Sequence, residues 1–349
     1  MPPAPHSGPA PYQTPIYLPV PVTSDPTPPV RRAQLAILAG HLTPRDQWLL
    51  EMVHEHKVLT SHHILALAYT GARTMRARLR LLTVHLRVLD RFRPRIPVGT
   101  APEHYVLGPA GAAWLAAARG ISVKEFGYHR ARAHQIAISS HLSHTIGTNA
   151  FFVALAAAHR ADPAAGHLAA WWSERRCLRL WEDLARPDGY GHYTLAPPDT
   201  DPAAARHVRF FVEYDTGTEA LTRLPAKLPG YARLAAATAR PQVVLFHLPS
   251  AVREEHLHQQ LARDPAPVPV ATTHPALLAE HGPAGPVWRP APTRSGRRAA
   301  PRVNLIDLDT LTPPASPRRA AEDLPAGPAW WTEPPTPLPP TDPHTPDRR

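Results

Sequence analysis

The sequence has little cysteine: Cys177 is the only one among 349 residues. A single thiol can form neither an intrachain disulfide nor a zinc site of several thiolates, so the chain fits a reducing compartment. No stretch approaches 18 uninterrupted apolar residues, and the proline-rich N-terminus lacks the basic-then-apolar pattern of a signal peptide. We therefore expect a soluble, cytoplasmic protein with no membrane partner.

Several motifs of common enzyme classes are also missing. The sequence contains no GxxxxGK[ST] and no GxGxxG, which argues against nucleotide-driven chemistry. It contains no GxSxG, and its lone cysteine lacks a recognisable nucleophile context. The 22 histidines are scattered, without the tyrosine and three-histidine cluster that a relaxase uses.

Proline is abundant, with 46 residues gathered mainly at the two ends. Such segments have no sustained apolar period and cannot bury enough apolar surface to offset the entropy of ordering. We expect residues 1–32 and 263–349 to be disordered, and the folded part to lie between them. One reading of these ends is that they recruit a partner through polyproline II contacts.

The formal net charge is +10, with an isoelectric point near 10.2. A basic chain favours a polyanionic partner, although charge alone is weak support because arginines are often simply solvated. The distribution of the arginines along the chain therefore carries more information than their number.

The segment 33–120 contains residues that typically start and end the helices of a small helical domain. Thr43 is suited to be an N-cap, with Pro44 at the first helical position and an acid in the first turn. A second helix begins at Thr60, and Thr70-Gly71 separates it from a third. The sequence therefore predicts three helices in quick succession.

The third predicted helix, 72–86, has two distinct faces. Its apolar residues recur at steps of four, three and four, which indicates a buried stripe formed by Met75, Leu79, Leu82 and Leu86. A second face carries arginines that could hold phosphates or guanine edges in a major groove, namely Arg73, Arg76 and Arg80, with Arg78 and Arg87 beside them.

A predicted hairpin follows, with strands at 88–93 and 104–107 and a basic connection that contains Arg95. Gly108-Pro109 then opens a helix that runs to Ala118. Three helices, a hairpin and a helix are the order of a winged helix-turn-helix, which we place at about 41–108 and expect to bind double-stranded DNA. Many winged helices read two-fold sites, so a homodimer is compatible with this reading.

The segment 135–262 predicts an α/β domain with a mixed sheet. Its predicted elements are a long helix 139–160, a strand 171–177, a turn 186–190, a loop 191–205, a strand 207–215, a helix 220–237 and a buried strand 241–248. The 207–215 strand places Phe211, Glu213 and Asp215 on one face. Two acids on an apolar strand are costly unless they are paired, metal-bound or at a cleft.

Carboxylates from separate strands together with a lysine are what a magnesium-dependent phosphodiesterase needs. Asp188, Glu213 and Lys227 are the candidate catalytic residues, and Asp188, Glu213 and Asp215 the candidate metal ligands, with Glu174 as a further one. The competing interpretation is that these residues form structural salt bridges.

The sequence resembles the replication-relaxation family of actinobacterial plasmids and mobile elements. The stretches that carry the resemblance run in order over roughly 41–250: LTPRDQWLLEMVHEHKVLT, LDRFRP, HYVLGPAGAAWLAA, WWSERRC, RPDGYG, FFVEYDTGTE, LPAKLPGYA and VVLFHLPS. The resemblance implies a role in plasmid replication and DNA relaxation, with replication or conjugation proteins as partners. It also implies a winged helix joined to a domain similar to PD-(D/E)XK nucleases, which are restriction-endonuclease-like, with Asp188 and Glu213 as the two acids.

The sequence departs from the nuclease pattern at one point. Asp215 stands where the pattern has lysine, and Lys227 on the following helix is the candidate for a migrated lysine. Two hypotheses stay open: a DNA-processing factor that nicks DNA with a magnesium site, or a non-catalytic replication accessory or transcriptional regulator whose nuclease-like domain is a platform. Dependence on a divalent cation distinguishes them.

Overall fold

The computed structural model describes residues 15, 17, 32–181, 183–196, 205–238, 242–292, 301–312 and 333–341. Of the ends predicted to be disordered, residues 1–14, 16, 18–31, 293–300, 313–332 and 342–349 lie outside the described residues. The chain divides into two compact units. The first unit is formed by Ile16–Asn149 with Gly327–Arg349, and the second by Ala150–Ala326 with Met1–Pro15. Each unit is considered separately.

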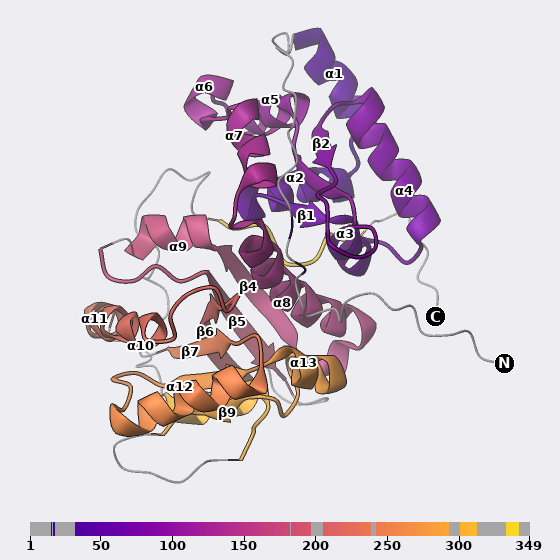
Figure 1. Ribbon diagram of the computed structural model, residues 1–349. Helices are drawn as coiled ribbons and strands as arrows, with labels where there is room; N and C mark the ends of the chain where they lie inside the picture. The colour runs from indigo at the N-terminus through magenta and orange to yellow at the C-terminus, as the bar shows by residue number, and fades with distance from the viewer. Residues whose placement is uncertain are drawn as a thin grey trace, which may run out of the picture. The chain divides into compact units, whose positions relative to one another are not determined.

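The first unit combines helices with a small antiparallel sheet (Figure 1). The sheet has the order β1-β3-β2, so the short first strand pairs with the far arm of the hairpin. Its elements are α1 Arg32–His41, α2 Pro44–His56, β1 Leu59–Thr60, α3 Ser61–Ala68, α4 Ala72–Arg80, the π-helical turn Leu81–His85, β2 Leu89–Phe92, β3 His104–Leu107, α5 Pro109–Ala118, α6 Val123–Phe126, α7 Arg130–His134 and the 3-10 turn Gln135–Ile138.

The predicted helix starts in the first unit are confirmed at atomic level. Thr43 forms a capping box with Asp46 at the start of α2, and the Thr60 hydroxyl accepts a hydrogen bond from the His63 amide at 3.1 Å. Gly111 has a different role, because a Cβ at this position would lie 2.2 Å from the Val88 carbonyl oxygen. The close approach of α5 to the start of β2 therefore requires glycine.

A compact apolar cluster supports the hairpin of the first unit. It contains Val58, Phe92, Val106, Ala137, Leu142 and Ile146, with Tyr17 packed against it. The Asn149 side-chain amide donates to the carbonyl oxygens of His56 and Val58, at 3.3 and 2.9 Å. The first unit therefore extends beyond the predicted boundary at residue 120 and includes the first part of the long helix that follows.

Two buried histidines lie beside the hairpin. Burial, with His104 and His62 nearby, lowers the pKa of His63 to about 3, and burial lowers the pKa of His104 to about 4 despite the Pro102 carbonyl. His104 contacts the rings of Phe92 and Tyr17, with centroids 5.2 and 5.0 Å away. Protonation would place charge in these apolar surroundings, so both histidines are neutral in the folded state at neutral pH.

We expect the stability of the first unit to fall as the pH drops from 6.5 towards 4. In this window the unfolded histidines bind protons that the folded ones do not, and each contributes a slope of about 1.4 kcal/mol per pH unit. His104→Gln should flatten the slope, whereas the exposed His85→Gln should not. Urea unfolding followed by hydrogen exchange of 59–107 measures this, and an unchanged slope in His104→Gln would contradict it.

The second unit is built on a six-stranded mixed sheet of order β4-β5-β6-β7-β8-β9 (Figure 1). The pairs β4–β5, β5–β6 and β8–β9 are antiparallel, and β6–β7 and β7–β8 are parallel. Its elements are α8 Leu142–Ala161, which begins in the first unit, the 3-10 turn Pro163–Ala165, β4 His167–Ser173, α9 Glu174–Trp181, β5 Gly189–Leu195, β6 Arg206–Tyr214, α10 Arg223–Ala226, α11 Leu228–Thr238, β7 Val243–His247, α12 Ala251–Arg263, β8 Val270–Thr273, α13 Pro275–His281, β9 Arg289–Pro290 and the 3-10 helix Leu305–Leu311.

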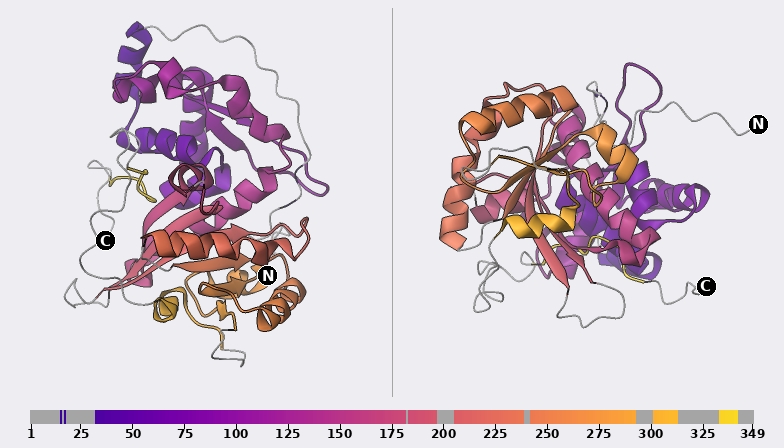
Figure 2. Two further views of the ribbon diagram at one scale, coloured as in Figure 1. Left: turned by 90° about the vertical axis from the view of Figure 1, so that its left-hand side faces the viewer. Right: turned by 90° about the horizontal axis from the view of Figure 1, so that it is seen from below.

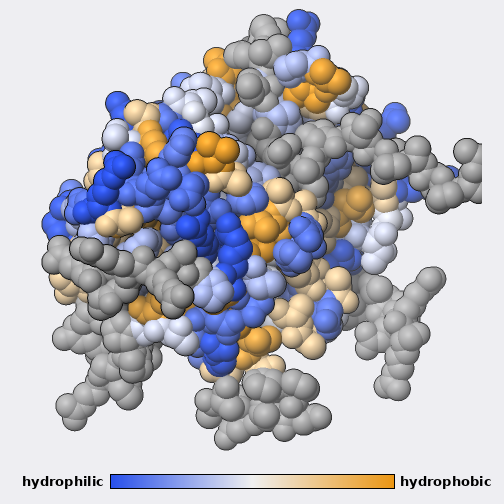
Figure 3. Space-filling view, turned by 60° about the horizontal axis from the view of Figure 1, so that its bottom comes forward, coloured by the Kyte–Doolittle hydropathy of each residue, from blue (hydrophilic) through white to orange (hydrophobic). Residues whose placement is uncertain are grey.

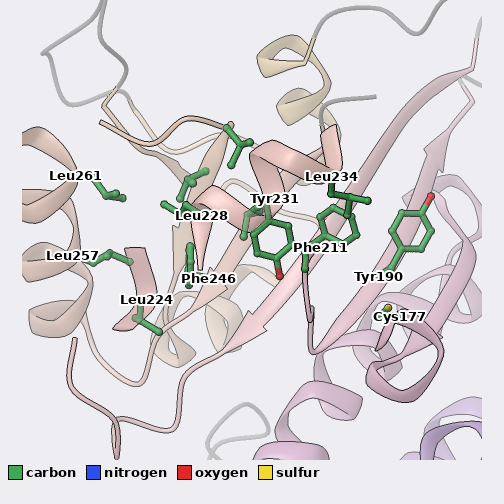
Figure 4. Close-up of a cluster of buried hydrophobic side chains, with 14 of the residues drawn as sticks. Cys177, Tyr190, Phe211, Leu224, Leu228, Tyr231, Leu234, Phe246, Leu257 and Leu261 are labelled. Carbon is green, nitrogen blue, oxygen red and sulfur yellow. The ribbon is translucent and has the colours of Figure 1, made fainter. Parts of the chain in front are cut away.

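The period-two pattern predicted for β6 separates the two faces of this sheet. Phe210 packs against Phe151 and Phe152 of α8 on one face. Phe211 lies on the other face, in a cluster with Tyr231 of α11 and Leu257 of α12 (Figure 4). The mixed α/β class is therefore confirmed, with helices on both faces of the sheet.

Three sequence predictions for the second unit were wrong. Residues 174–177 begin helix α9 instead of extending a strand, because the Ser173 hydroxyl caps it through the Arg176 amide at 3.2 Å. Residues 191–195, predicted as loop, form most of β5. Part of the 263–349 tail is folded, because β8 buries Val270, α13 buries Leu278, and Trp288 is buried just before β9.

No helix among the described residues is long and apolar enough to cross a membrane. On the face drawn in Figure 3, hydrophilic residues predominate and hydrophobic ones are scattered in small groups. The surface seen there therefore offers no single large apolar area.

Candidate DNA-binding and carboxylate sites

Helix α4 presents its two predicted faces to different surroundings. Met75 and Leu79 are buried, whereas Arg73, Arg76 and Arg80 are exposed. The Arg76 Nε donates to the Ala72 carbonyl at 3.1 Å, a bond within the helix that leaves the end of the guanidinium outward. In the described part of the chain these three arginines form no ion pair with a carboxylate. The helix therefore carries a basic, solvent-facing edge.

Arg78 forms contacts within the fold, unlike the exposed arginines of α4. Its Nε donates to Asp46 Oδ1 at 3.0 Å, and its Nη2 pairs with the same carboxylate and donates to the His41 carbonyl at 2.7 Å. Asp46 is 1% exposed. Arg78 thus joins α4 to the start of α2, a role that the sequence prediction of a DNA contact did not anticipate.

We expect Arg78→Ala to destabilise the first unit by roughly 3–5 kcal/mol, because it leaves the buried Asp46 carboxylate without its cation. Arg80→Ala, two residues away and exposed, should change stability by less than about 0.5 kcal/mol. Urea unfolding of the two variants compares them directly. Equal stabilities would show that the Arg78–Asp46 pair contributes little.

The hairpin carries the remaining predicted basic residues. Arg87 and Arg95 are exposed, and Arg87 has a left-handed backbone with φ of 53° just before β2. Arg93 pairs with Glu103 across the hairpin at 2.8 Å. The connection between β2 and β3 extends as a long loop (Figure 2). The positive charge of this loop therefore rests on Arg95 more than on Arg93.

In the second unit, one carboxylate lies at the centre of a small polar site. Glu213 on β6 is 1% exposed, and its two oxygens have different partners. Lys227, just after α10, forms an ion pair with Oε2, and the Tyr231 hydroxyl donates to Oε1. The Lys227 side chain is 39% exposed, so its amine connects the buried carboxylate to the solvent. The predicted lysine therefore reaches the predicted acid.

Asp188 approaches the same site from the neighbouring strand. It immediately precedes β5, and its amide donates to the Val212 carbonyl at 3.1 Å. Its Oδ2 accepts a hydrogen bond from the Tyr214 amide at 2.8 Å. Two β6 backbone groups, one on either side of Glu213, thus fix the aspartate beside it.

Burial and the close approach of charged groups in this site shift the pKa values of Glu213 and Lys227. Burial, followed by the charge of Asp188, raises the pKa of Glu213 to about 7, although Lys227 and Tyr231 act in the opposite direction. Burial opposes the charged form of Lys227, but Glu213 and Asp188 outweigh it and raise the pKa of the amine. Asp188, Glu213 and Lys227 thus influence one another's charge within one small site.

Asp215 does not join this group. It pairs with Arg253 of α12, and its Oδ1 accepts a hydrogen bond from the Gly217 amide at 2.8 Å. Among the described residues, no group of three or more His, Cys, Asp and Glu side chains is placed so that it could hold a metal ion. Glu174, the further predicted ligand, therefore belongs to no such group. The structure therefore brings Asp188, Glu213 and Lys227 together and leaves Asp215 in a separate ion pair.

Two contributors were missed from the sequence. Tyr231 lies one helical turn after Lys227, and this spacing could have indicated that both side chains face β6. Arg253 gave no signal, because its link to Asp215 depends on how α12 packs against the sheet. Both residues complete hydrogen bonds of buried carboxylates.

Comparison with known proteins places the chain in a family. A family model described as replication-relaxation matches residues 50–244, more than half of the chain. The chain belongs to the replication-relaxation family. The match covers α4, the hairpin and the residues Asp188, Glu213 and Lys227. Neither the curated proteins nor the solved structures contain a significant match. The family suggests a role in replication and relaxation.

Proposed function

We propose that this replication-relaxation protein binds duplex DNA of a plasmid or mobile element through a winged helix-turn-helix at about 41–108. The observation that carries the proposal is the exposed arginine edge of α4, opposite a buried face. The order α2, α3, α4 and the β2–β3 hairpin supports it, because a winged helix-turn-helix places its recognition helix third and its wing next.

The chemistry of the edge fits nucleic acid. Arg73, Arg76 and Arg80 step by three and four residues, so their guanidinium groups follow one line along the helix. Guanidinium groups pair with phosphate oxygens in a bidentate way, and a major groove about 12 Å wide admits an α-helix. Arg95 on the hairpin loop and Arg87 before it would add phosphate contacts beside the groove.

We further propose that the second unit is restriction-endonuclease-like and nicks the bound DNA. The supporting observation is that Asp188 and Glu213 come from neighbouring antiparallel strands, with Lys227 on the carboxylate of Glu213. The order α8, β4, α9, β5, β6, α10, α11, β7, with β7 parallel to β6, supports this proposal, because apart from α9 and α10 it follows the pattern helix, three strands, helix, strand.

The donor set fits magnesium, which is usually held by one or two carboxylates together with water and substrate phosphates. Asp188 and Glu213 would hold the cation, which would polarise the scissile phosphate and lower the pKa of attacking water. Lys227, whose side chain is partly exposed, would then offset charge that develops on the phosphate. The Tyr214 amide would keep Asp188 oriented, and Tyr231 would do the same for Glu213.

One observation favours a second candidate function. Both oxygens of Glu213 already have partners in Lys227 and Tyr231, as in a closed structural network. On this alternative the second unit is a non-catalytic platform, and the protein is a replication accessory or transcriptional regulator. Binding of duplex DNA would then proceed without any divalent cation.

The two functions are tested with purified full-length protein on supercoiled plasmid. Gel shift in chelator measures binding, and conversion to open circles in magnesium or manganese measures nicking. Binding together with metal-dependent nicking is the result expected from the proposal. Binding without nicking would leave the platform function, and no binding would contradict the DNA-binding assignment.

A further inference from the structure

A proline-rich stretch near the end of the chain lies on the first unit. Residues 333–341, EPPTPLPPT, belong to this unit although the preceding folded segment 301–312 belongs to the second. The indole Nε1 of Trp48 on α2 donates to the Thr336 carbonyl at 2.7 Å. Pro337 is buried, and Trp48 is 6% exposed. A defined contact therefore joins the tail to the helical unit.

The groups in this contact are those of proline-peptide recognition. Five of the nine residues are proline, which has no amide hydrogen and leaves the carbonyl oxygens as the polar groups for a partner to bind. Tryptophan is a donor only, and its flat apolar ring with one N–H suits a proline-rich backbone. The Thr336 hydroxyl donates to the Leu338 carbonyl at 2.8 Å and fixes the chain next to Pro337.

We propose that the surface at Trp48 is a binding site for proline-rich peptides and that residues 333–341 of the same chain are its ligand. The tail segment lies well outside the residues 50–244 that match the family, whereas Trp48 lies just before them on α2. The proposal does not depend on the DNA-binding or nicking proposals. On this proposal, the proline-rich segment near the C-terminus binds its own chain in preference to a separate partner protein.

Intramolecular binding has a quantitative consequence. The twenty residues 313–332 connect the tail segment to the second unit, so the segment is present at a high effective concentration next to its site. Effective concentrations of linked ligands reach the millimolar range. A proline-rich partner in solution must compete with the tail, and release of the tail should open the site.

The experiment uses full-length protein and a fluorescein-labelled peptide of sequence EPPTPLPPT, followed by fluorescence anisotropy. Pro337→Asp releases the tail, because it places a charge in a buried position. The released variant should bind the peptide at least about tenfold more tightly than wild type. Adding Trp48→Phe should weaken that binding about fivefold, because the indole N–H is lost. Trp114→Phe, the same change in α5 of the same unit, should leave it unaltered.

Several outcomes would overturn the proposal. One is that Pro337→Asp binds the peptide no better than wild type, and another is that Trp48→Phe has no effect in the released background. Sedimentation tests the occupant: a wild-type dimer that dissociates on Pro337→Asp would show that the tail binds a second copy instead. Pro337→Asp alters only the tail, so this comparison stays decisive even if Trp48→Phe does not fold.

Discussion

Replacing Arg73, Arg76 and Arg80 together by alanine is expected to weaken duplex DNA binding by at least about 100-fold at moderate salt. These arginines are exposed on α4 and, within the described residues, pair with no carboxylate. Their loss should therefore remove the proposed DNA contacts and, within the fold, little more than the Arg76–Ala72 hydrogen bond. The slope of log K against log salt should become flatter by about three, one for each lost phosphate contact. Fluorescence anisotropy with a labelled duplex between 50 and 300 mM salt would measure both quantities.

The control for this variant removes the same charge elsewhere. Lys124, Arg132 and Arg263 are also exposed, and their triple alanine variant lowers the net charge by three without touching α4. It should keep most of the wild-type affinity. If the two triple variants lose affinity equally, binding follows net charge alone, and α4 is not the recognition helix.

Glu213→Gln is expected to reduce metal-dependent nicking on the order of 100- to 1000-fold. The amide keeps the shape of the carboxylate and can still meet Lys227 and Tyr231, but it carries no charge for a divalent cation. Binding in chelator should be unaffected, because the proposed DNA-binding residues belong to the first unit. Open-circle formation from supercoiled plasmid, quantified over time, measures the loss.

Asp215→Asn is the matched control, since it makes the same chemical change two residues further along the chain. Asp215 is held by Arg253 away from the Glu213 group, so this variant should nick at close to the wild-type rate once its folded fraction is verified. If Asp215→Asn abolishes nicking and Glu213→Gln does not, the proposed ligands are wrongly assigned. If neither changes the rate, the nicking arises elsewhere.

Local signals explain why much of the first unit could be predicted from the sequence. Thr43 and Thr60 start helices through bonds to amides three residues away, and Gly108-Pro109 opens α5 as expected. The apolar spacing of Met75, Leu79 and Leu82 marks the buried face of α4 and its continuation. These features depend on neighbours within one helical turn, which a single sequence contains.

Contacts between distant elements could not be predicted in the same way. Arg78 looks like its neighbours on α4, and only the packing of α2 shows that it holds Asp46, 32 residues earlier. Prolines led to the expectation that everything after residue 262 is disordered, yet Val268, Val270 and Trp288 bury enough apolar surface to add strands and a helix. Composition averages over a segment, whereas burial depends on a few side chains.

In the candidate site, some features could be predicted from the sequence and others depend on contacts between distant elements. Asp188 and Glu213 are matched to the two acids of the nuclease pattern through the resemblance, whereas the strand β5 that brings Asp188 beside β6 is predicted as turn and loop. Lys227 meets Glu213 from a position between α10 and α11, where the sequence predicts one continuous helix of 220–237. Tyr231 binds the second oxygen of Glu213; its spacing from Lys227 indicates a shared face, but the contact itself follows from the packing of α11 against β6.

The central claim is that the chain binds duplex DNA and nicks it with a metal site in the second unit. Its most direct test is wild-type protein incubated with supercoiled plasmid, in chelator and in magnesium, with gel shift and open-circle formation read on the same samples. We expect a shifted band in both conditions and open circles in magnesium only. An unshifted plasmid in chelator, or no open circles in magnesium or manganese, would contradict the corresponding half of the claim.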